Sequence, residues 1–146
     1  MAGGVIDSFQ GDYRWLSNFE PCEVAFEGIL YPSTEHAYQA AKTLDRTTRA
    51  AIASMSSPGK AKRAGAAVKS RPDWPLVKLQ IMEDILRQKF QQVRFRKLLL
   101  STGDMEIIEG NTWGDTFWGV CGGVGENHLG RIIMKLRGEW MEGLTA

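Results

Sequence analysis

Four polar side chains in residues 31–42 (YPSTEHAYQAAK) have the types and the spacing that acid–base or nucleophilic chemistry needs. They stand at the i, i+3, i+4 and i+7 positions of a helical repeat: Glu35, Tyr38, Gln39 and Lys42. A helix places such positions on one face. Glu35 would lie in the first turn, where the helix dipole favours an ionised carboxylate. Two interpretations stay open, an acid–amine pair of an active site or two surface charges.

A second group follows in residues 109–120 (EGNTWGDTFWGV), where three glycines permit sharp turns. Trp113 and Trp118 could wall a pocket for a flat heterocycle. Asp115 between them offers a second carboxylate, and cleavage of a glycosidic bond commonly uses two carboxyl groups. The alternative is that the tryptophans are core residues and that Asp115 caps a turn.

Residues 122–127 (GGVGEN) resemble a loop that cradles phosphate at the N-terminus of a helix. They lack the Gly-Lys-Ser/Thr of a P-loop and the glycine spacing of a dinucleotide-binding loop. A flexible loop with an N-cap explains the pattern equally well.

The distribution of charge is uneven although the net charge is only +1. Residues 46–72 contain seven basic side chains and no Asp or Glu: Arg46, Arg49, Lys60, Lys62, Arg63, Lys69 and Arg71. A block of one sign can attract phosphate. A solvated helix face is the alternative interpretation.

Composition narrows the class of protein. A chain of 146 residues, 43% apolar and 24% charged, is typical of one globular domain with its own core. No apolar run approaches the roughly 20 residues of a membrane span, and the N-terminus does not read as a signal peptide, so we expect a cytoplasmic protein. Cys22 and Cys121 lack metal-ligand spacing, and two histidines are too few for a histidine-rich zinc site, so we expect no metal and no cofactor.

The elements that must position these residues are mostly helices. Residues 22–32 alternate on both sides of Glu27-Gly28 and predict a hairpin, whereas residues 12–21 (DYRWLSNFEP) are aperiodic and predict a loop. Ser33 or Thr34 would cap a helix from Glu35 to about residue 44. Residues 46–55 predict a second helix, and a third begins at the cap-like Ser57 with Pro58 in its first turn.

The second half of the chain also predicts helices. Asp73 would cap the longest helix, and apolar residues repeat along it at spacings of three and four: Leu79, Met82, Leu86, Phe90 and Val93. Residues 94–104 contain another helical stretch, which Gly103 stops, and residues 105–111 read as a short strand. A last helix begins near residue 126 or 127. The pattern predicts a mainly α single domain over residues 1–146, with a small β element built from the hairpin and the strand near residues 106–109.

Five motifs occur in an order that resembles the NADAR family, also called YbiA-like. They are DYRWLSNFEP, YPSTEHAYQAAK, RPDW before a long helix that contains KF, EGNTWGDTFWGV, and GENHLGRIIMKLR. The resemblance covers roughly residues 9–137. It implies a mainly helical single domain and an N-glycosidase, a metal-independent N-glycosyl hydrolase that cleaves the bond between ribose C1 and a nitrogen.

The resemblance implies two substrate classes. One is ADP-ribose attached to guanine in nucleic acid, with an ADP-ribosyltransferase toxin as a functional counterpart. The other is a ribosylaminopyrimidine phosphate of the early riboflavin pathway. We expect the first class. Trp113 precedes GDTFWG here, whereas many family members have little tryptophan before this Asp, and the extra aromatic ring could alter which base is accepted.

The resemblance also assigns roles to residues. Glu35 matches the catalytic glutamate, Lys42 a lysine that could form a Schiff base with the sugar, and Asp115 the second carboxylate. The implied substrate-binding residues are Asn18, Tyr38, Gln39, Trp74, Trp113, Trp118, Gly125 and Asn127.

Two other classes of function stay open. A module that only reads ADP-ribose or nucleotides would need aromatic rings and phosphate donors, but no acid–base set such as Glu35, Lys42 and Asp115. A helical nucleic-acid-binding domain would use the basic block and bind duplex in a strongly salt-dependent way. The small net charge argues against that as the main activity.

Overall fold

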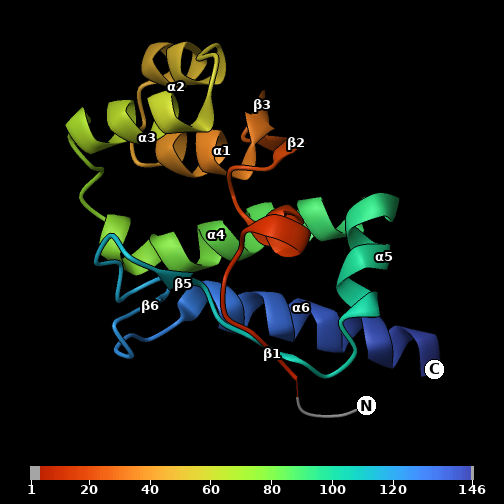
Figure 1. Cartoon of the computed structure of the whole chain (residues 1–146). Helices are drawn as coiled ribbons and strands as arrows, with labels where there is room; N and C mark the ends of the chain where they lie inside the picture. The colour runs from red at the N-terminus through yellow and green to blue at the C-terminus, as the bar shows by residue number, and fades with distance from the viewer. Residues whose placement is uncertain (1–3, 146) are drawn as a thin grey trace. The chain divides into compact units, whose positions relative to one another are not determined.

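A computed structural model describes residues 4–145 (Figure 1). The chain forms two compact units. One of them, here called the central unit, spans Asn18–Lys89, and the other, the terminal unit, combines the chain before Asn18 with the chain from Phe90 onward. The single domain predicted over residues 1–146 stays a prediction, since two compact units can belong to one domain.

The central unit opens with the predicted hairpin. β2 (Pro21–Phe26) pairs antiparallel with β3 (Ile29–Ser33). Glu27 and Gly28 have φ angles of 46° and 87°, and positive φ at both positions is typical of the type I′ turn of a two-residue hairpin loop. The carboxamide of Gln88 accepts from the backbone N–H of Ala25 at 2.8 Å and donates to its carbonyl at 2.6 Å. These bonds tie the hairpin to the helix that carries Gln88.

Four helices follow the hairpin: α1 (Thr34–Ala41), α2 (Arg46–Ala53), α3 (Pro58–Ala67) and α4 (Trp74–Gln91), which runs on into the terminal unit. Ser33, Asp45 and Ser57 cap the first three with their side chains, as such residues do where a helix leaves extended chain. Small residues let α1 pack closely against its neighbours, because Ala37, Ala40 and Ala41 have no exposed surface. Figure 1 shows α1, α2 and α3 grouped beside the hairpin.

The terminal unit is built from short strands and two helices. β1 (Val5–Ile6) runs parallel to β4 (Glu106–Ile107), and β5 (Gly110–Asn111) runs parallel to β6 (Val120–Cys121). α5 (Val93–Ser101) ends before Gly103, whose φ is 61°, and α6 (His128–Thr145) closes the chain. The core of this unit includes Ile6, Leu16, Leu99, Ile107 and Ile133.

The structure confirms a mainly helical fold with a few short strands, and it corrects several details. The predicted 12–21 loop contains a 3-10 helix, η1 (Gly11–Leu16). The β residues do not form one element, since the described strands make three separate two-stranded ladders. α1 ends at Ala41 rather than near residue 44, because Lys42 is its C-cap.

The apolar stripe predicted for the longest helix is also partly wrong. Leu79 is partly exposed and Val93 is exposed, while Ile81 and Ile85 are buried instead. Val93 belongs to α5, because the chain breaks helical geometry at Gln92. No helix among the described residues combines the length and the apolar character that crossing a membrane requires.

Candidate functional site

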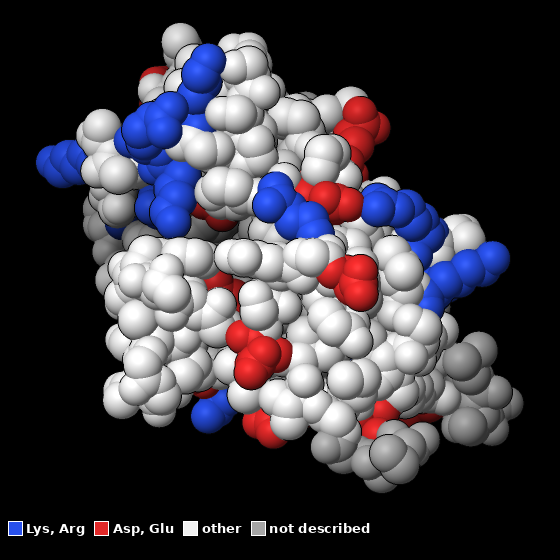
Figure 2. Space-filling view, viewed as in Figure 1, with Lys and Arg blue, Asp and Glu red and all other residues white. Residues whose placement is uncertain are grey.

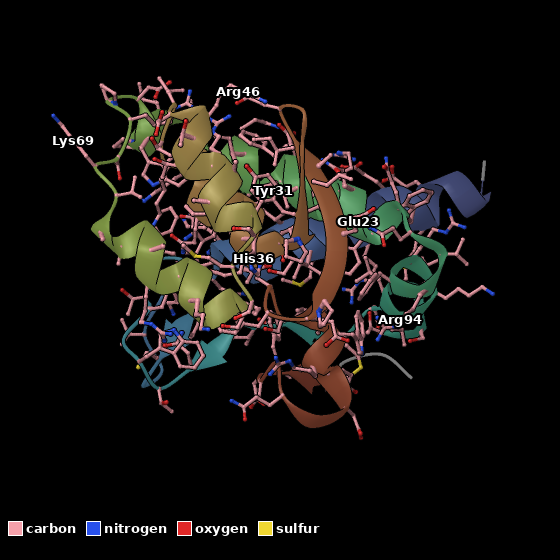
Figure 3. The ribbon with its side chains drawn as sticks, turned by 90° about the horizontal axis from the view of Figure 1, so that it is seen from above. Glu23, Tyr31, His36, Arg46, Lys69 and Arg94 are labelled. Carbon is pink, nitrogen blue, oxygen red and sulfur yellow. The ribbon has the colours of Figure 1, made fainter. Side chains whose placement is uncertain are left out.

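The N-terminus of α1 is fixed by Ser33 and His36. The hydroxyl of Ser33 accepts from the backbone N–H of His36 at 3.1 Å and lies 2.7 Å from its Nδ1. The Nε2 atom of His36 lies 3.0 Å from the carbonyl oxygen of Met55, which can only accept, so Nε2 carries the hydrogen. The Ser33 hydroxyl and Nδ1 therefore share a hydrogen bond on the other side of the ring. His36, which Figure 3 shows in the interior of the central unit, has a structural role.

Asn18 determines where Glu35 stands. Its backbone carbonyl accepts from the backbone N–H of Glu35 at 3.1 Å and from the hydroxyl of Thr34 at 3.0 Å. Its side chain is buried between Thr34 and Met82, with Oδ1 3.0 Å from the Thr34 hydroxyl and Nδ2 3.7 Å from the Met82 sulfur. The structure thus gives Asn18 a scaffold role, and its predicted substrate contact stays a prediction.

Glu35 and Gln39 form a buried pair on one face of α1, as the spacing predicted. They are 7% and 4% exposed, and Nε2 of Gln39 donates to Oε2 of Glu35 at 2.6 Å. This orientation of the carboxamide follows from chemistry, because a carboxylate oxygen can only accept. Oε1 of Gln39 packs against Gly65 of α3, where no donor of the described chain reaches it. Gln39 therefore holds the carboxylate of Glu35 in place.

Lys42 lies at the C-cap of α1, and its Nζ is 5.7 Å from the centre of the Tyr38 ring. The side chain is half-buried. Burial lowers the pKa of Lys42, the Glu35 carboxylate opposes that shift, and the Lys62 and Lys78 ammonium groups add to it. A larger fraction of Lys42 is therefore a neutral amine than of an ordinary lysine at the same pH.

Trp74 comes to this face of α1 from the start of α4. Its ring centre is 5.2 Å from that of Tyr38, and both rings are buried. The RPDW segment positions it: the backbone N–H of Arg71 donates to the carbonyl of Lys42 at 2.7 Å, and the Arg71 guanidinium binds Asp73 at 2.6 Å. We name this set the α1 cluster, and its members are Glu35, Tyr38, Gln39, Lys42 and Trp74.

In the terminal unit, Asp115 caps a turn of the Gly-rich loop. Its Oδ1 accepts from the backbone N–H groups of Phe117 and Trp118 at 3.1 and 2.9 Å. Asn111 bonds to the backbone N–H and carbonyl of Asp115 at 3.0 and 2.9 Å. This is the alternative that the sequence left open, and the role of a second catalytic carboxylate stays a prediction.

The two tryptophans of this loop differ in their surroundings. Trp113 is 57% exposed. Trp118 lies in an aromatic group, 4.9 Å from Phe117 and 6.5 Å from His128 between ring centres. Trp118 is therefore partly a packing residue, whereas Trp113 presents its ring at the surface.

Gly125 and Asn127 shape the end of the loop. A Cβ on Gly125, whose φ is 157°, would collide with the backbone carbonyl of Gly119. The Asn127 carboxamide donates to the carbonyl of Ile107 and accepts from the N–H of Glu109, both at 2.9 Å. Asn127 thus fastens β4 to the start of α6, and a phosphate contact here stays a prediction.

The structure therefore brings five of the predicted residues together in the α1 cluster of the central unit, and Asn18 of the same unit holds the backbone of Glu35. The other predicted residues belong to the terminal unit: Trp113, Asp115, Trp118, Gly125 and Asn127. Sequence reasoning missed Lys78 as a neighbour of Lys42 and assigned Lys62 only to the basic block. One signal was available for Lys78, which stands four residues after Trp74 and so on the same face of α4. Within the described residues, no three or more His, Cys, Asp or Glu side chains are grouped as metal ligands.

Comparison with known proteins gives consistent results. The model of the NADAR domain matches residues 7–141. The N-glycosidase YbiA of Escherichia coli is 40% identical over 135 residues, which cover 89% of this chain and 83% of that protein. A riboflavin biosynthesis protein of Vibrio vulnificus is 36% identical over 135 residues, 90% of this chain and 36% of that longer protein.

The fold has a counterpart among solved structures. The NMR structure of the Escherichia coli protein YbiA superposes with a TM-score of 0.85 at 36% sequence identity. The alignment covers 100% of this chain and 91% of the other.

Proposed function

The chain belongs to the NADAR family, and we infer from this that it is an N-glycosidase that hydrolyses the bond between a phosphorylated ribose and the nitrogen of a base. One observation carries the proposal: a buried carboxylate, Glu35, and an amine of lowered pKa, Lys42, share one face of α1. A module that only binds nucleotides needs no such pair. Pairs of this kind are typical of catalytic sites.

In the proposed reaction Lys42 is the nucleophile. Its neutral amine attacks C1 of the ribose, and the new C1–Nζ bond forms as the C1–N bond to the base breaks. The electron pair leaves with the base nitrogen, which takes a proton from solvent. The lowered pKa of Lys42 supports this role, because only the unprotonated amine is a nucleophile.

Glu35 is the proton carrier in this scheme. It accepts the proton that the attacking amine releases and returns it to the ring oxygen as the ribose opens to an iminium on Lys42. Water then adds to the iminium carbon, and the amine leaves, so free base and free ribose are the products. Gln39 supports these steps by holding Oε2 of Glu35 at 2.6 Å. Since the steps use only side chains of this protein, we expect turnover to persist in a chelator.

The first substrate we propose is ADP-ribose on guanine in nucleic acid. The support is the surface of α2, α3 and the segment after them, which carries five exposed basic side chains: Arg46, Lys60, Lys62, Arg63 and Lys69. Figure 2 shows basic side chains gathered on the part of the surface where Figure 1 places α2 and α3. Such a surface can contact a nucleic-acid backbone near the modified base. An ADP-ribosyltransferase toxin in the same cytoplasm would then generate the substrate.

A ribosylaminopyrimidine phosphate is the second candidate. The support here is the relative from Vibrio vulnificus, which is named as a riboflavin biosynthesis protein. Both candidates join a phosphorylated ribose to an amino-substituted pyrimidine ring, so the chemistry of the α1 cluster would be the same.

The experiment is a hydrolysis assay in EDTA, with products identified by mass spectrometry. The protein is given ADP-ribosylated guanine DNA and, separately, the ribosylaminopyrimidine phosphate. Release of ADP-ribose from DNA supports the first substrate, and release of ribose phosphate from the pyrimidine supports the second. Binding of both without release of either sugar would refute the N-glycosidase proposal.

A further inference from the structure

The carboxamide group of Gln39 has different surroundings at its two ends. At one end, Nε2 donates to Oε2 of Glu35 at 2.6 Å. At the other end, Oε1 packs on Gly65 of α3, where no donor of the described chain reaches it. The reverse orientation would place two oxygen atoms 2.6 Å apart, and a carboxylate has no hydrogen to put between them. The carboxamide is therefore turned so that its hydrogen points to the Glu35 carboxylate.

A bond of the same chemical type lies on the surface of α4 and serves as a comparison. Nε2 of Gln80 donates to Oδ1 of Asp84 at 2.9 Å, and both residues are exposed. Each pair is spaced by four residues along a helix, but Glu35 and Gln39 are buried. A buried hydrogen bond to a charged acceptor is the stronger one, because water neither screens it nor competes for it. We therefore expect the bond of Gln39 to outlast that of Gln80.

Packing against α3 fixes the Gln39 side chain as a whole. A Cβ at Gly65 would collide with Oε1, Cδ and Cβ of Gln39, so the side chain occupies that space along much of its length. Gly65 is itself buried, and only 4% of Gln39 is exposed. The carboxamide has no room to swing into solvent when the charge on Glu35 changes. Gln39 is therefore placed to keep one oxygen of Glu35 engaged throughout a reaction cycle.

A carboxyl group that gains a proton has two different oxygen atoms. The hydroxyl oxygen carries the hydrogen, and the carbonyl oxygen keeps its full capacity to accept. An N–H group held 2.6 Å from Oε2 of Glu35 favours the form in which Oε2 is the carbonyl oxygen. Protonation of Oε2 would weaken this bond inside the protein, where a donor without an acceptor is destabilising. The contact with Gln39 thus favours a proton on Oε1.

We propose that Gln39 is a positioning residue that keeps Oε2 of Glu35 as an acceptor, so that Oε1 is the atom that carries the proton. The inference rests on the proposed function, because it names the atom through which Glu35 acts in that reaction. As the C1–Nζ bond forms, the Nζ–H bond of Lys42 breaks and an Oε1–H bond forms. The Oε1–H bond breaks in turn when the proton passes to the ring oxygen of the ribose. Glu35 thus returns to the ionised state, and Oε2 takes part in neither transfer.

The first test observes the hydrogen bond itself and does not depend on turnover. Two-dimensional proton–nitrogen NMR records the side-chain amide groups of the wild type. We expect one amide hydrogen of Gln39 to resonate downfield of both amide hydrogens of Gln80 and to exchange more slowly with solvent, because its bond is buried and charge-assisted.

The same spectra of Glu35→Gln test which oxygen carries the proton. The introduced carboxamide stands in for the protonated carboxyl group, its oxygen for the carbonyl oxygen and its nitrogen for the hydroxyl oxygen. We expect its oxygen to face Gln39, so that the Gln39 amide hydrogens show nuclear Overhauser contacts to residue 35. If its nitrogen faced Gln39, the Gln39 carboxamide would turn over and bring its amide hydrogens against the Hα atoms of Gly65.

The second test measures kcat and KM of Gln39→Met with the substrate that the wild type hydrolyses. Methionine has a similar length but donates no hydrogen bond, and Gln80→Met is the matched control. We expect kcat of Gln39→Met to fall about 10- to 100-fold with KM nearly unchanged, because a carboxyl group that loses its support is misplaced for the reaction. A residue that only binds substrate would change KM instead. Circular dichroism verifies that each variant is folded.

Three results would overturn the inference. One is a Gln39 amide group that resonates and exchanges like that of Gln80 in the wild type. Another is contact of the Gln39 amide hydrogens with Gly65 in Glu35→Gln. The third is a folded Gln39→Met protein with unchanged kcat. The NMR results decide the matter even if the hydrolysis assay finds no turnover, so the proposed function and this inference can fail separately.

Discussion

At the scale of single residues, the site depends on a short sequence of contacts along α1. Asn18 holds the backbone of Glu35, Gln39 holds its carboxylate, and Lys42 follows one turn later. The pair of Glu35 and Gln39 is buried, so its hydrogen bond is weakly screened by water. The site therefore combines the Glu35 carboxylate, one oxygen of which is held by Gln39, with the Lys42 amine, whose pKa burial lowers.

The pH dependence of turnover follows from Lys42. Since burial lowers its pKa, the rate of the chemical step should rise with pH through a pKa below that of an ordinary lysine. Stability should also rise with pH between the folded and the unfolded pKa of Lys42, because the unfolded chain binds more protons in that interval. Single-turnover rates from pH 6 to about pH 10 measure the first effect.

Trapping of the intermediate tests the same role directly. Sodium cyanoborohydride should reduce the iminium and leave a ribosyl adduct on Lys42, found by peptide mass spectrometry. Lys42→Arg should give no adduct and no turnover. The control variant Lys97→Met changes an exposed lysine on α5 of the terminal unit and should behave as the wild type. Full turnover in Lys42→Arg would exclude covalent catalysis by this side chain.

Much of the site on α1 could be predicted from the sequence. The contacts between α1 and residues far away in the chain could not. The shared face of Glu35 and Gln39 follows from helical spacing alone. The packing of Trp74 on Tyr38 joins residues 36 positions apart and depends on the turn at Arg71, which spacing does not reveal. The backbone contacts of Asn127 could not be predicted either, because only the folded loop brings Ile107 and Glu109 close to its side chain.

At the scale of elements, the contact of α1 with α3 supports the site. Gly65 has no side chain, and Gln39 occupies the space that a Cβ would take. Gly65 is therefore a packing requirement and not a source of flexibility. Any side chain at this position would push Gln39 away from α3 and disturb its bond to Glu35.

We predict that Gly65→Ala lowers both stability and turnover. Overpacking typically costs about 1–3 kcal/mol, and the better helix propensity of alanine returns about 1 kcal/mol, so a net loss of about 1 kcal/mol is expected. Gly59→Ala is the matched control on the same helix, since the atoms nearest to its Cβ are 3.9 Å away. Thermal unfolding and kcat measure the two effects. Equal melting temperatures for both variants would contradict this account of the α1–α3 contact.

Some elements were predictable because local sequence signals determine where they begin. The caps Ser33 and Ser57 and the Glu27-Gly28 turn are local signals, and they placed two helix starts and a hairpin correctly. The second helix was predicted from residue 46 without a cap, and the structure shows that Asp45 caps it. The parallel ladders of β1 with β4 and β5 with β6 are two residues long on each side and have no periodicity to detect. Their pairing is set by tertiary contacts.

At the scale of the whole molecule, the net charge is small, but basic side chains are concentrated in one part of the chain. The net charge is +1, and of the seven basic residues between positions 46 and 72, Arg49 and Arg71 are paired with Glu27 and Asp73. The exposed remainder includes Arg46 and Lys69, and Figure 3 shows their side chains at the edge of the central unit, away from Tyr31 and His36. Such a surface is better suited to transient contact with nucleic acid than to tight binding of it.

The dependence of KM on salt concentration should therefore distinguish the two candidate substrates. The KM for ADP-ribosylated DNA should rise with salt concentration. In the triple variant Lys60→Gln, Arg63→Gln, Lys69→Gln, the slope of log KM against log salt concentration should fall by about 2, since each lost phosphate contact removes about 0.7–0.9 from it. The KM for the pyrimidine phosphate should change little in the triple variant. Equal slopes for the wild type and the triple variant on DNA would show that this surface does not contact the substrate.

The most direct test of the central claim is the turnover number of Glu35→Gln against Glu23→Gln. Glutamine at position 35 keeps an acceptor for Gln39 and the volume of the side chain, but it cannot carry a proton. Glu23 is exposed on β2 and controls for the loss of one charge (Figure 3). Using whichever substrate the wild type hydrolyses, we predict a fall in kcat of about 10²–10⁴ for Glu35→Gln, with a folded protein and an unchanged control. A folded Glu35→Gln protein with wild-type kcat would contradict the catalytic role of the α1 cluster.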